Sequence, residues 1–315
     1  MARQRWESLD DLRGLAVLVM VPVNVAAPFT AIPGWLKHAP ATGLTIADFV
    51  VPVFLFSLGL SSSFSFASRL RERGVARTIL HALLRYALLF VFGVIGVLFV
   101  DTGARWEMLE TLGLTGIFSF FFLFLPPWPR AAAAVLLLAA AEVARPLGLG
   151  SLINAWYDSG LGGPWGTFSL SFLVILASSL GQVLKEATTR RRILAAGATA
   201  AILCAAGLLS LIWIPFSKHL LSLSYILFTG GAAAALLAVL VSVTEVVHLR
   251  VPLLGSLGRN PLLLYMLHAV LGVLLLLVVP GTSNALAAWL STLLVLAVCC
   301  AVAVVLDRRG WYVKL

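Results

Sequence analysis

Long apolar runs dominate the pattern of hydrophobic and polar positions along this chain. Most runs are about 20 residues long, which is the length that a helix needs to cross the hydrocarbon core of a bilayer. Apolar and polar positions do not alternate with a period of two, so membrane helices are favoured over barrel strands. Ten spans are predicted, covering residues 14–32, 45–67, 78–100, 108–126, 131–149, 166–184, 193–213, 222–247, 260–279 and 285–306.

The composition supports the same prediction. Of the 315 residues, 61% are hydrophobic and only 11% are charged. A soluble domain could not bury so much apolar surface. We therefore predict an all-α polytopic membrane protein with a single transmembrane domain over residues 1–315. The basic segment before the first run resembles a signal peptide, but nine further runs follow it, which favours a first membrane helix.

The basic residues predict the orientation. With ten spans, both termini lie on one side, and 18 of the 22 Lys and Arg residues fall on that side. Only Lys37, Arg105, Arg145 and Lys218 fall on the other. The positive-inside rule therefore predicts cytoplasmic termini and a multi-pass protein of the cell membrane, whose inner ends contact anionic lipids. Because topology accounts for the net charge of +9, no nucleic-acid partner is expected.

The three cysteines are Cys204, Cys299 and Cys300, and all of them lie inside predicted spans. A thiol in such a position usually acts as a small apolar filler. Neither a disulfide framework nor a metal site is expected from them.

A first group of polar residues lies at the predicted outer side. His38 lies in the loop "WLKHAPATG", Asp48 begins the second span, and Asn24 lies near the outer end of the first. An ionisable group beside a span is costly unless it is paired or hydrated. Because His38 and Asp48 flank a short turn, the carboxylate can orient the imidazole for acid-base or nucleophilic chemistry. The alternative is an interfacial histidine and a helix-start aspartate favoured by the helix dipole.

Three serines of the second span, Ser57, Ser61 and Ser65, are spaced by four residues and share one helix face. That face can line a polar path. Small residues at this spacing also allow two membrane helices to pack closely, which is the structural alternative.

A second group lies at the predicted cytoplasmic side. Four arginines can form a pocket for phosphates, because guanidinium groups bind phosphate through paired hydrogen bonds. Topology and lipid headgroups are the alternative explanation. Asn260 starts the ninth span, and His268 lies roughly 12 Å along it, where an imidazole needs a partner or water. The four arginines are Arg13, Arg69, Arg85 and Arg259.

A third group lies in "PFSKHLLSLSY", residues 215–225, at the same outer side as His38. Lys218, Ser222 and Tyr225 are candidate substrate contacts there. Snorkelling of Lys218 and His219 to the interface is the alternative.

These segments together resemble the membrane acyltransferases related to heparan-alpha-glucosaminide N-acetyltransferase. The matching pieces occur in the family's order over nearly the whole chain: "SLDDLRGLAVLVMVPVN", "KHAPATGLTIADFVVPVFLFSLGLSSSFSF", "PFSKHLLSLSYILFTGG" and "GRNPLLLYMLH". The resemblance implies ten or eleven helices that carry an acetyl group from cytosolic acetyl-CoA to an amino sugar across the membrane. It implies His38 as the catalytic histidine, with Asn24 and Asp48 near the reacting groups.

The resemblance also implies the partners. The cosubstrate is acetyl-CoA, held by the arginines, Asn260 and His268; the acceptor is an amino sugar or another cell-envelope glycan; and a homodimer is suggested. The chain departs from the family pattern at Ala41 and Thr42, at Leu109–Thr111, and at Ala269 after His268. The donor pocket and the choice of acceptor are expected to differ accordingly.

Two other functions fit the same residues. One is a transporter or flippase for a glycan, lipid-linked sugar or small solute, with Asp48, His268 and the serine face lining the route. Pro52 and Gly59 are the interruptions that the second span offers, without a symmetric counterpart elsewhere. The other is an acyltransferase that modifies hydroxyl groups of envelope polymers.

Overall fold

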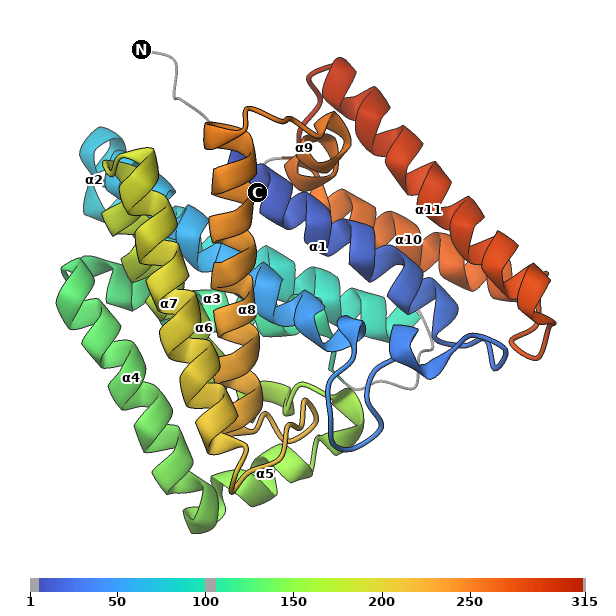
Figure 1. Ribbon diagram of the computed structural model, residues 1–315, viewed down its shortest axis with the longest axis horizontal. Helices are drawn as coiled ribbons and strands as arrows, with labels where there is room; N and C mark the ends of the chain where they lie inside the picture. The colour runs from blue at the N-terminus through green and yellow to red at the C-terminus, as the bar shows by residue number, and fades with distance from the viewer. Residues whose placement is uncertain (1–5, 100–105, 314–315) are drawn as a thin grey trace.

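The computed structural model describes residues 6–99 and 106–313, and within those ranges it is built from helices and loops without a strand (Figure 1). Each of the ten predicted spans overlaps a helix, which confirms the all-α class. Arg3, Arg5, Arg105 and Lys314, which contributed to the predicted orientation, lie outside the described residues. The α-helices are α1 (Glu7–Ala26), α2 (Val50–Phe99), α3 (Met108–Phe120), α4 (Pro127–Ala144), α5 (Gly150–Asn154), α6 (Gly166–Lys185), α7 (Thr189–Ser210), α8 (Leu223–Val241), α9 (Pro252–Arg259), α10 (Pro261–Leu276) and α11 (Ala285–Arg308).

Shorter helical segments complete the described chain. Those of 3-10 type are η1 (Gly34–Leu36), η2 (Ile46–Phe49), η3 (Phe121–Phe124), η5 (Tyr157–Ser159) and η6 (Gly163–Trp165). Two π-helical turns, η4 (Arg145–Leu149) and η7 (Ser242–Val246), extend α4 and α8.

Six helical segments in the described part of the chain are long and apolar enough to cross a membrane, and a seventh results if α9 and α10, which meet at 85°, form one broken span. The protein is therefore membrane-embedded. Fewer segments qualify than the ten predicted spans, because α2 joins two of them, α1 carries four charged residues in its first two turns, and α3 is short. Ten crossings and their orientation stay predictions.

Gly74 interrupts α2 between the second and third predicted spans. Its φ of 74° and ψ of 175° belong to a region that is accessible essentially to glycine alone. The predicted spans 45–67 and 78–100 imply a loop between them, and this expectation is wrong, since the chain is helical on both sides of Gly74. The bend lets the first half of α2 contact α6 at Gly59 and the second half contact α3 at Gly113, while Ser62 Oγ and Tyr86 Oη join the halves at 2.8 Å.

Glycines allow neighbouring helices to come into backbone contact. A Cβ at Gly14 would lie 1.9 Å from the carbonyl oxygen of Leu254, and one at Gly258 would lie 1.8 Å from that of Asp10. Backbone contact between α1 and α9 therefore depends on these two glycines, as in membrane helix pairs that use small residues. Gly59 gives α2 the same access to α6 at Val174. The contact of α1 with α9 brings Arg13 and Arg259 to the same end of the molecule.

The candidate residues gather at two ends of the helix bundle. We call the loops of residues 27–45, 155–165 and 211–222 the His38 end, and these loops meet at one edge of the bundle near α5 (Figure 1). The Gly43 amide donates to the Phe216 carbonyl at 2.9 Å there. We call the region of Gly74, α9 and the start of α1 the Arg259 end. The N-terminal half of α2 connects the two ends through the core.

Candidate functional site

The His38 loop is held by the carboxylate of Asp48, whose side chain is fully buried. Asp48 Oδ2 accepts hydrogen bonds from the backbone amides of Thr45, at 2.9 Å, and Ala39, at 3.3 Å. The Thr45 hydroxyl lies 3.1 Å from the same oxygen and donates to the Lys37 carbonyl at 2.6 Å. Asp48 therefore closes the turn before η2 in the manner of a capping box, and the loop is fixed by local sequence.

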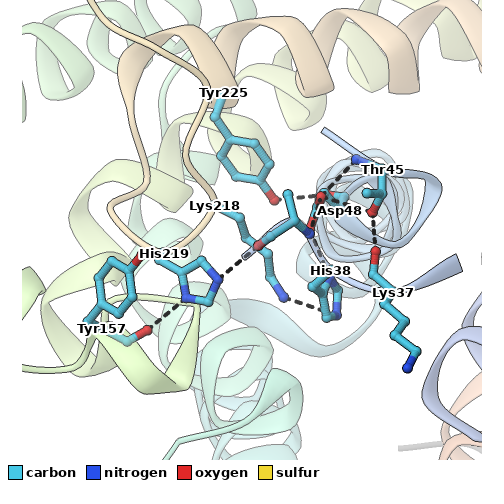
Figure 2. A network of polar contacts seen from close by, with 9 residues as sticks. Lys37, His38, Thr45, Asp48, Tyr157, Lys218, His219 and Tyr225 are labelled. Carbon is cyan, nitrogen blue, oxygen red and sulfur yellow. Dashed lines mark hydrogen bonds and ion pairs between the residues drawn. The ribbon is translucent and has the colours of Figure 1, made fainter. Parts of the chain in front are cut away.

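The second oxygen of Asp48 faces His38, as Figure 2 shows, with 2.8 Å between Oδ1 and the imidazole Nδ1. A carboxylate only accepts hydrogen bonds, so Nδ1 carries the proton and Nε2 keeps its lone pair. The His38 side chain is 37% exposed. An oriented, partly exposed imidazole with one basic nitrogen is the arrangement that general-base or nucleophilic chemistry requires.

Lys218 comes from a loop far along the chain and places its Nζ 3.1 Å from His38 Nε2 (Figure 2). Burial lowers the pKa of Lys218 to about 8, although the charges of Asp48 and Glu107 act in the opposite direction. Partial burial also lowers the pKa of His38, against the hydrogen bond that its Nδ1 donates to Asp48, and the Lys218 charge adds to the lowering. Near neutral pH the arrangement is a neutral imidazole beside an ammonium group.

The turn that carries Lys218 contains a strained backbone conformation, and hydrogen bonds from Arg145 stabilise it. Leu221 has a φ of 49°, an unusual value for a branched side chain. The Arg145 guanidinium donates to the carbonyls of Leu220, at 2.9 Å, and Leu221. The sequence indicated only an outward basic residue at position 145. Its bracing role depends on a contact 75 residues away that no local pattern reveals.

His219 connects three loops at the same end. Its two ring nitrogens lie 2.9 Å from the Tyr157 carbonyl and 3.2 Å from the Ala39 carbonyl, and its ring stacks on that of Tyr157 at 4.6 Å (Figure 2). His219 therefore fixes the distance between the Lys218 turn and the His38 loop.

Ser222 and Tyr225, which we predicted as substrate contacts, are buried and bonded to protein groups. Ser222 caps α8, accepting from the amides of Ser217 and Tyr225 at 2.9 and 3.3 Å. The Tyr225 hydroxyl donates to the Asp48 carbonyl at 2.9 Å. Both side chains position the Lys218 turn and the start of η2.

Asn24 pairs with His268 in the structure, and not with His38 or Asp48 as predicted. Asn24 Nδ2 lies 3.0 Å from His268 Nε2, while His268 Nδ1 lies 3.1 Å from the Leu264 carbonyl. Because a carbonyl only accepts, Nδ1 is the donor and Nε2 accepts from Asn24. The buried His268 therefore has hydrogen-bond partners at both ring nitrogens, as a polar side chain inside an apolar helix requires.

A cavity of about 310 Å³ lies at the Arg259 end, and it brings the predicted cationic group together. Its arginines come from α1, from both halves of α2 and from α9. Two of them have carboxylate partners, since Arg13 lies 3.3 Å from Asp10 and Arg259 pairs with Asp307. The residues predicted from sequence that line the cavity are Arg13, Ser57, Ser61, Arg69, Arg85, Arg259 and Asn260.

Asn260 also holds the segment that follows α11. Its side-chain amide donates to the Trp311 carbonyl at 3.0 Å and accepts from the Val313 amide at 2.9 Å. Val313 lines the cavity, so this segment forms part of its wall.

The cavity extends from the arginines toward the His38 end. Tyr265 and Met108 line it, and the Tyr265 ring lies 5.2 Å from that of His268. Glu107, next to Met108, is close enough for its charge to act on Lys218. Burial raises the pKa of Glu107. Sequence reasoning missed Glu107, although a carboxylate just before an apolar helix is a signal that could have found it.

Comparisons with known proteins give a distant relationship. A family model described as a domain of unknown function (DUF5009) matches residues 5–126, the part that holds His38, Asp48 and three of the four cavity arginines. The chain is 40% identical over 73 residues to heparan-alpha-glucosaminide N-acetyltransferase of Homo sapiens. That alignment covers 23% of this chain and only 10% of the human protein.

Proposed function

We propose that this protein transfers an acyl group, in the simplest case acetyl, from a cytosolic acyl-CoA to an acceptor at the His38 end. One observation carries the proposal: an arginine-lined cavity and an oriented histidine lie at opposite ends of one membrane-embedded bundle, with polar groups between them. The partial similarity to a membrane acetyltransferase supports the same reaction class.

The cavity suits the donor. Guanidinium groups bind phosphate oxygens, and the apolar wall with Ser57 and Ser61 suits a pantetheine arm. At about 310 Å³ the cavity accommodates part of a CoA thioester, so the arm has to continue past Tyr265 toward the other end. The phosphates stay on the cytoplasmic side while the thioester reaches His38, and the donor does not cross the membrane whole.

His38 acts through Nε2. In direct transfer this nitrogen takes the proton of the acceptor's hydroxyl or amine as that group attacks the thioester carbonyl. The C–S bond breaks and the proton then passes to the departing thiolate. Asp48 keeps the productive tautomer and stabilises the imidazolium that forms. In the covalent alternative Nε2 itself attacks the thioester carbonyl, the C–S bond breaks and CoA leaves as its thiolate. In a second step the acceptor's hydroxyl or amine attacks the acyl-His38, the C–N bond breaks, and the acceptor's proton passes to the released imidazole.

Lys218 supplies a cation beside the reacting carbon. Its ammonium group occupies the hydrogen-bond position at His38 Nε2 before the acceptor enters, and it moves to the carbonyl oxygen when negative charge develops there. The acceptor is an amino sugar or another glycan that reaches the exposed side of His38. On this proposal the His38 end faces outward from the cell membrane, both termini are cytoplasmic, and a homodimer is the assembly that the family resemblance suggests.

The test uses protein purified in detergent, with radiolabelled acetyl-CoA and glucosamine. Label should move to the sugar with release of free CoA thiol, and calorimetry should detect acetyl-CoA binding. Absence of both binding and CoA release would contradict the proposal.

A transporter or flippase for a glycan, lipid-linked sugar or small solute is the second candidate. The 85° break between α9 and α10 favours it, because broken helices line substrate sites in transporters. Accumulation of a labelled solute in proteoliposomes, without any consumption of acetyl-CoA, would select this function.

The pKa of Lys218 predicts how transfer depends on pH. Because that pKa is lowered to about 8, the ammonium is present below this pH and is lost as pH rises through it. We expect kcat/KM of the wild type to fall along an alkaline limb in this region. Lys218→Arg keeps its charge and should shift the limb to higher pH, whereas Lys218→Met should be slow throughout. An unmoved limb in Lys218→Arg would assign the titration to another group.

A further inference from the structure

A second, small cavity of about 20 Å³ adjoins the arginine-lined cavity and shares Arg69 and Arg85 with it. His81 and Thr78 of α2 also line it, together with Ser62 from the other half of that helix. A cavity of this size has room for about one water molecule. A larger group can therefore sit only at its mouth, where the two shared arginines lie.

Two buried polar atoms in this cavity lack a partner in the described structure. They are His81 Nε2 and Arg85 Nε. A buried polar atom without a hydrogen-bond partner destabilises the folded protein, so these two atoms call for an explanation. His81 and Arg85 are four residues apart on α2 and share a helix face, so both can bind one ligand. A guanidinium beside an imidazole selects an anion.

The arginine at this site differs from two other arginines of the large cavity in its ion pairs. Arg13 and Arg259 have carboxylate partners in Asp10 and Asp307. Arg85 forms no ion pair within the described residues, and its guanidinium lies over the Tyr86 ring at 5.6 Å. Of these three arginines, Arg85 is therefore the one whose charge no carboxylate among the described residues compensates. The most highly charged part of a bound anion should lie there.

We propose that His81 and Arg85, with Arg69 at the shared rim, bind a terminal phosphate monoester of the donor, namely the ribose 3′-phosphate of CoA. This inference rests on the proposed function and adds to it the feature by which the donor is selected. A monoester carries about −1.5 to −2 charges near neutral pH. Each of the two phosphates in the pyrophosphate, like a phosphodiester, carries only one charge and suits the compensated arginines Arg13 and Arg259.

The bend at Gly74 brings the residues of this site together. It reverses the chain so that Arg69, before the bend, and Arg85, after it, line the same two cavities. The hydrogen bond between the hydroxyls of Ser62 and Tyr86 keeps the two halves of α2 together beside the small cavity.

The experiment measures the affinities of CoA and 3′-dephospho-CoA by calorimetry. The wild type should prefer CoA by about 10-fold or more, as expected for hydrogen bonds to a charged group. His81→Ala and Arg85→Ala should each reduce this preference toward one, and in His81→Ala the affinity for dephospho-CoA should be unchanged. Arg77→Ala removes an exposed cation from the same helix outside both cavities, and it should keep the preference.

Other outcomes would overturn the assignment in different ways. An undiminished preference in both folded variants would exclude His81 and Arg85 as its source. If neither nucleotide binds the wild type, the proposed function fails and this site fails with it. The wild type could also bind CoA and 3′-dephospho-CoA with equal affinity. If phosphatidylglycerol vesicles then stabilise the wild type but not His81→Ala, the site binds a lipid phosphate.

Competition with the wild type covers the case of variants that do not fold. Adenosine 3′,5′-bisphosphate should displace CoA at lower concentration than adenosine 5′-monophosphate does. Equal potency of the two nucleotides would count against the assignment.

Discussion

Replacing His38 by alanine is expected to lower the rate of acyl transfer by about 10²–10⁴ or more while the protein stays folded. The loss follows from the role proposed for Nε2, the basic nitrogen of a partly exposed imidazole. The fold should survive because 37% of the His38 side chain is exposed and Asp48 keeps its bonds to Thr45 and Ala39. The measurement is transfer of radiolabelled acetyl by equal amounts of monodisperse protein.

His219→Ala is the matched control for His38→Ala. It removes a second imidazole from the same end, which contacts two carbonyls and the Tyr157 ring. A modest loss of activity is expected there, because His219 only sets the distance between loops. Full activity in His38→Ala would move the base to another residue, and equal losses in the two variants would indicate a structural effect.

The same variant separates the two mechanisms. If transfer is covalent, the wild type should retain acetyl label when acetyl-CoA is supplied without acceptor, and His38→Ala should not. If transfer is direct, neither protein retains label and CoA is released only when acceptor is present.

Asp48→Asn should impair both routes, since an amide can donate to Nδ1 and so favour the wrong tautomer.

The helices were predictable because each one follows from a contiguous apolar run. The His38–Asp48 pair was predictable for a similar reason, since ten residues separate the two positions and a turn lies between them. The four arginines that line the large cavity were also grouped together in the prediction, because the positive-inside rule expects basic residues to collect at one membrane face. Local sequence and topology were sufficient for all of these.

Contacts between distant segments were not predictable. Asn24 and His268 are separated by 244 positions, and the sequence placed Asn24 beside the His38 group instead. Gly74 lies among arginines, and nothing in its neighbourhood indicates that helix continues on both sides. His81 lies inside an apolar run, and its relevance appears only when the bend brings Arg69 next to Arg85. These features depend on packing between helices, which a single sequence does not specify.

Removal of Arg130 is expected to have the largest effect on stability. The residue is 2% exposed, and its guanidinium donates to four carbonyls and to Gln182 Oε1. The four carbonyls belong to Phe122, Leu123, Leu125 and Ser178. Although the sequence counted Arg130 among the residues that set orientation, its contacts tie η3 and the start of α4 to α6.

Arg130→Met should lower the free energy of unfolding by about 3 kcal/mol or more. Several carbonyls lose their donor at about 1–3 kcal/mol each, and relief from burying a charge offsets part of this loss. Thermal unfolding in detergent measures the change, with Arg191→Ala as control because it removes an exposed cation that is expected to change stability by less than about 0.5 kcal/mol. Equal melting temperatures in the two variants would contradict a structural role. Since Arg130 does not line the donor cavity, the folded fraction of Arg130→Met should bind acetyl-CoA as the wild type does, which distinguishes this arginine from those proposed to hold phosphate.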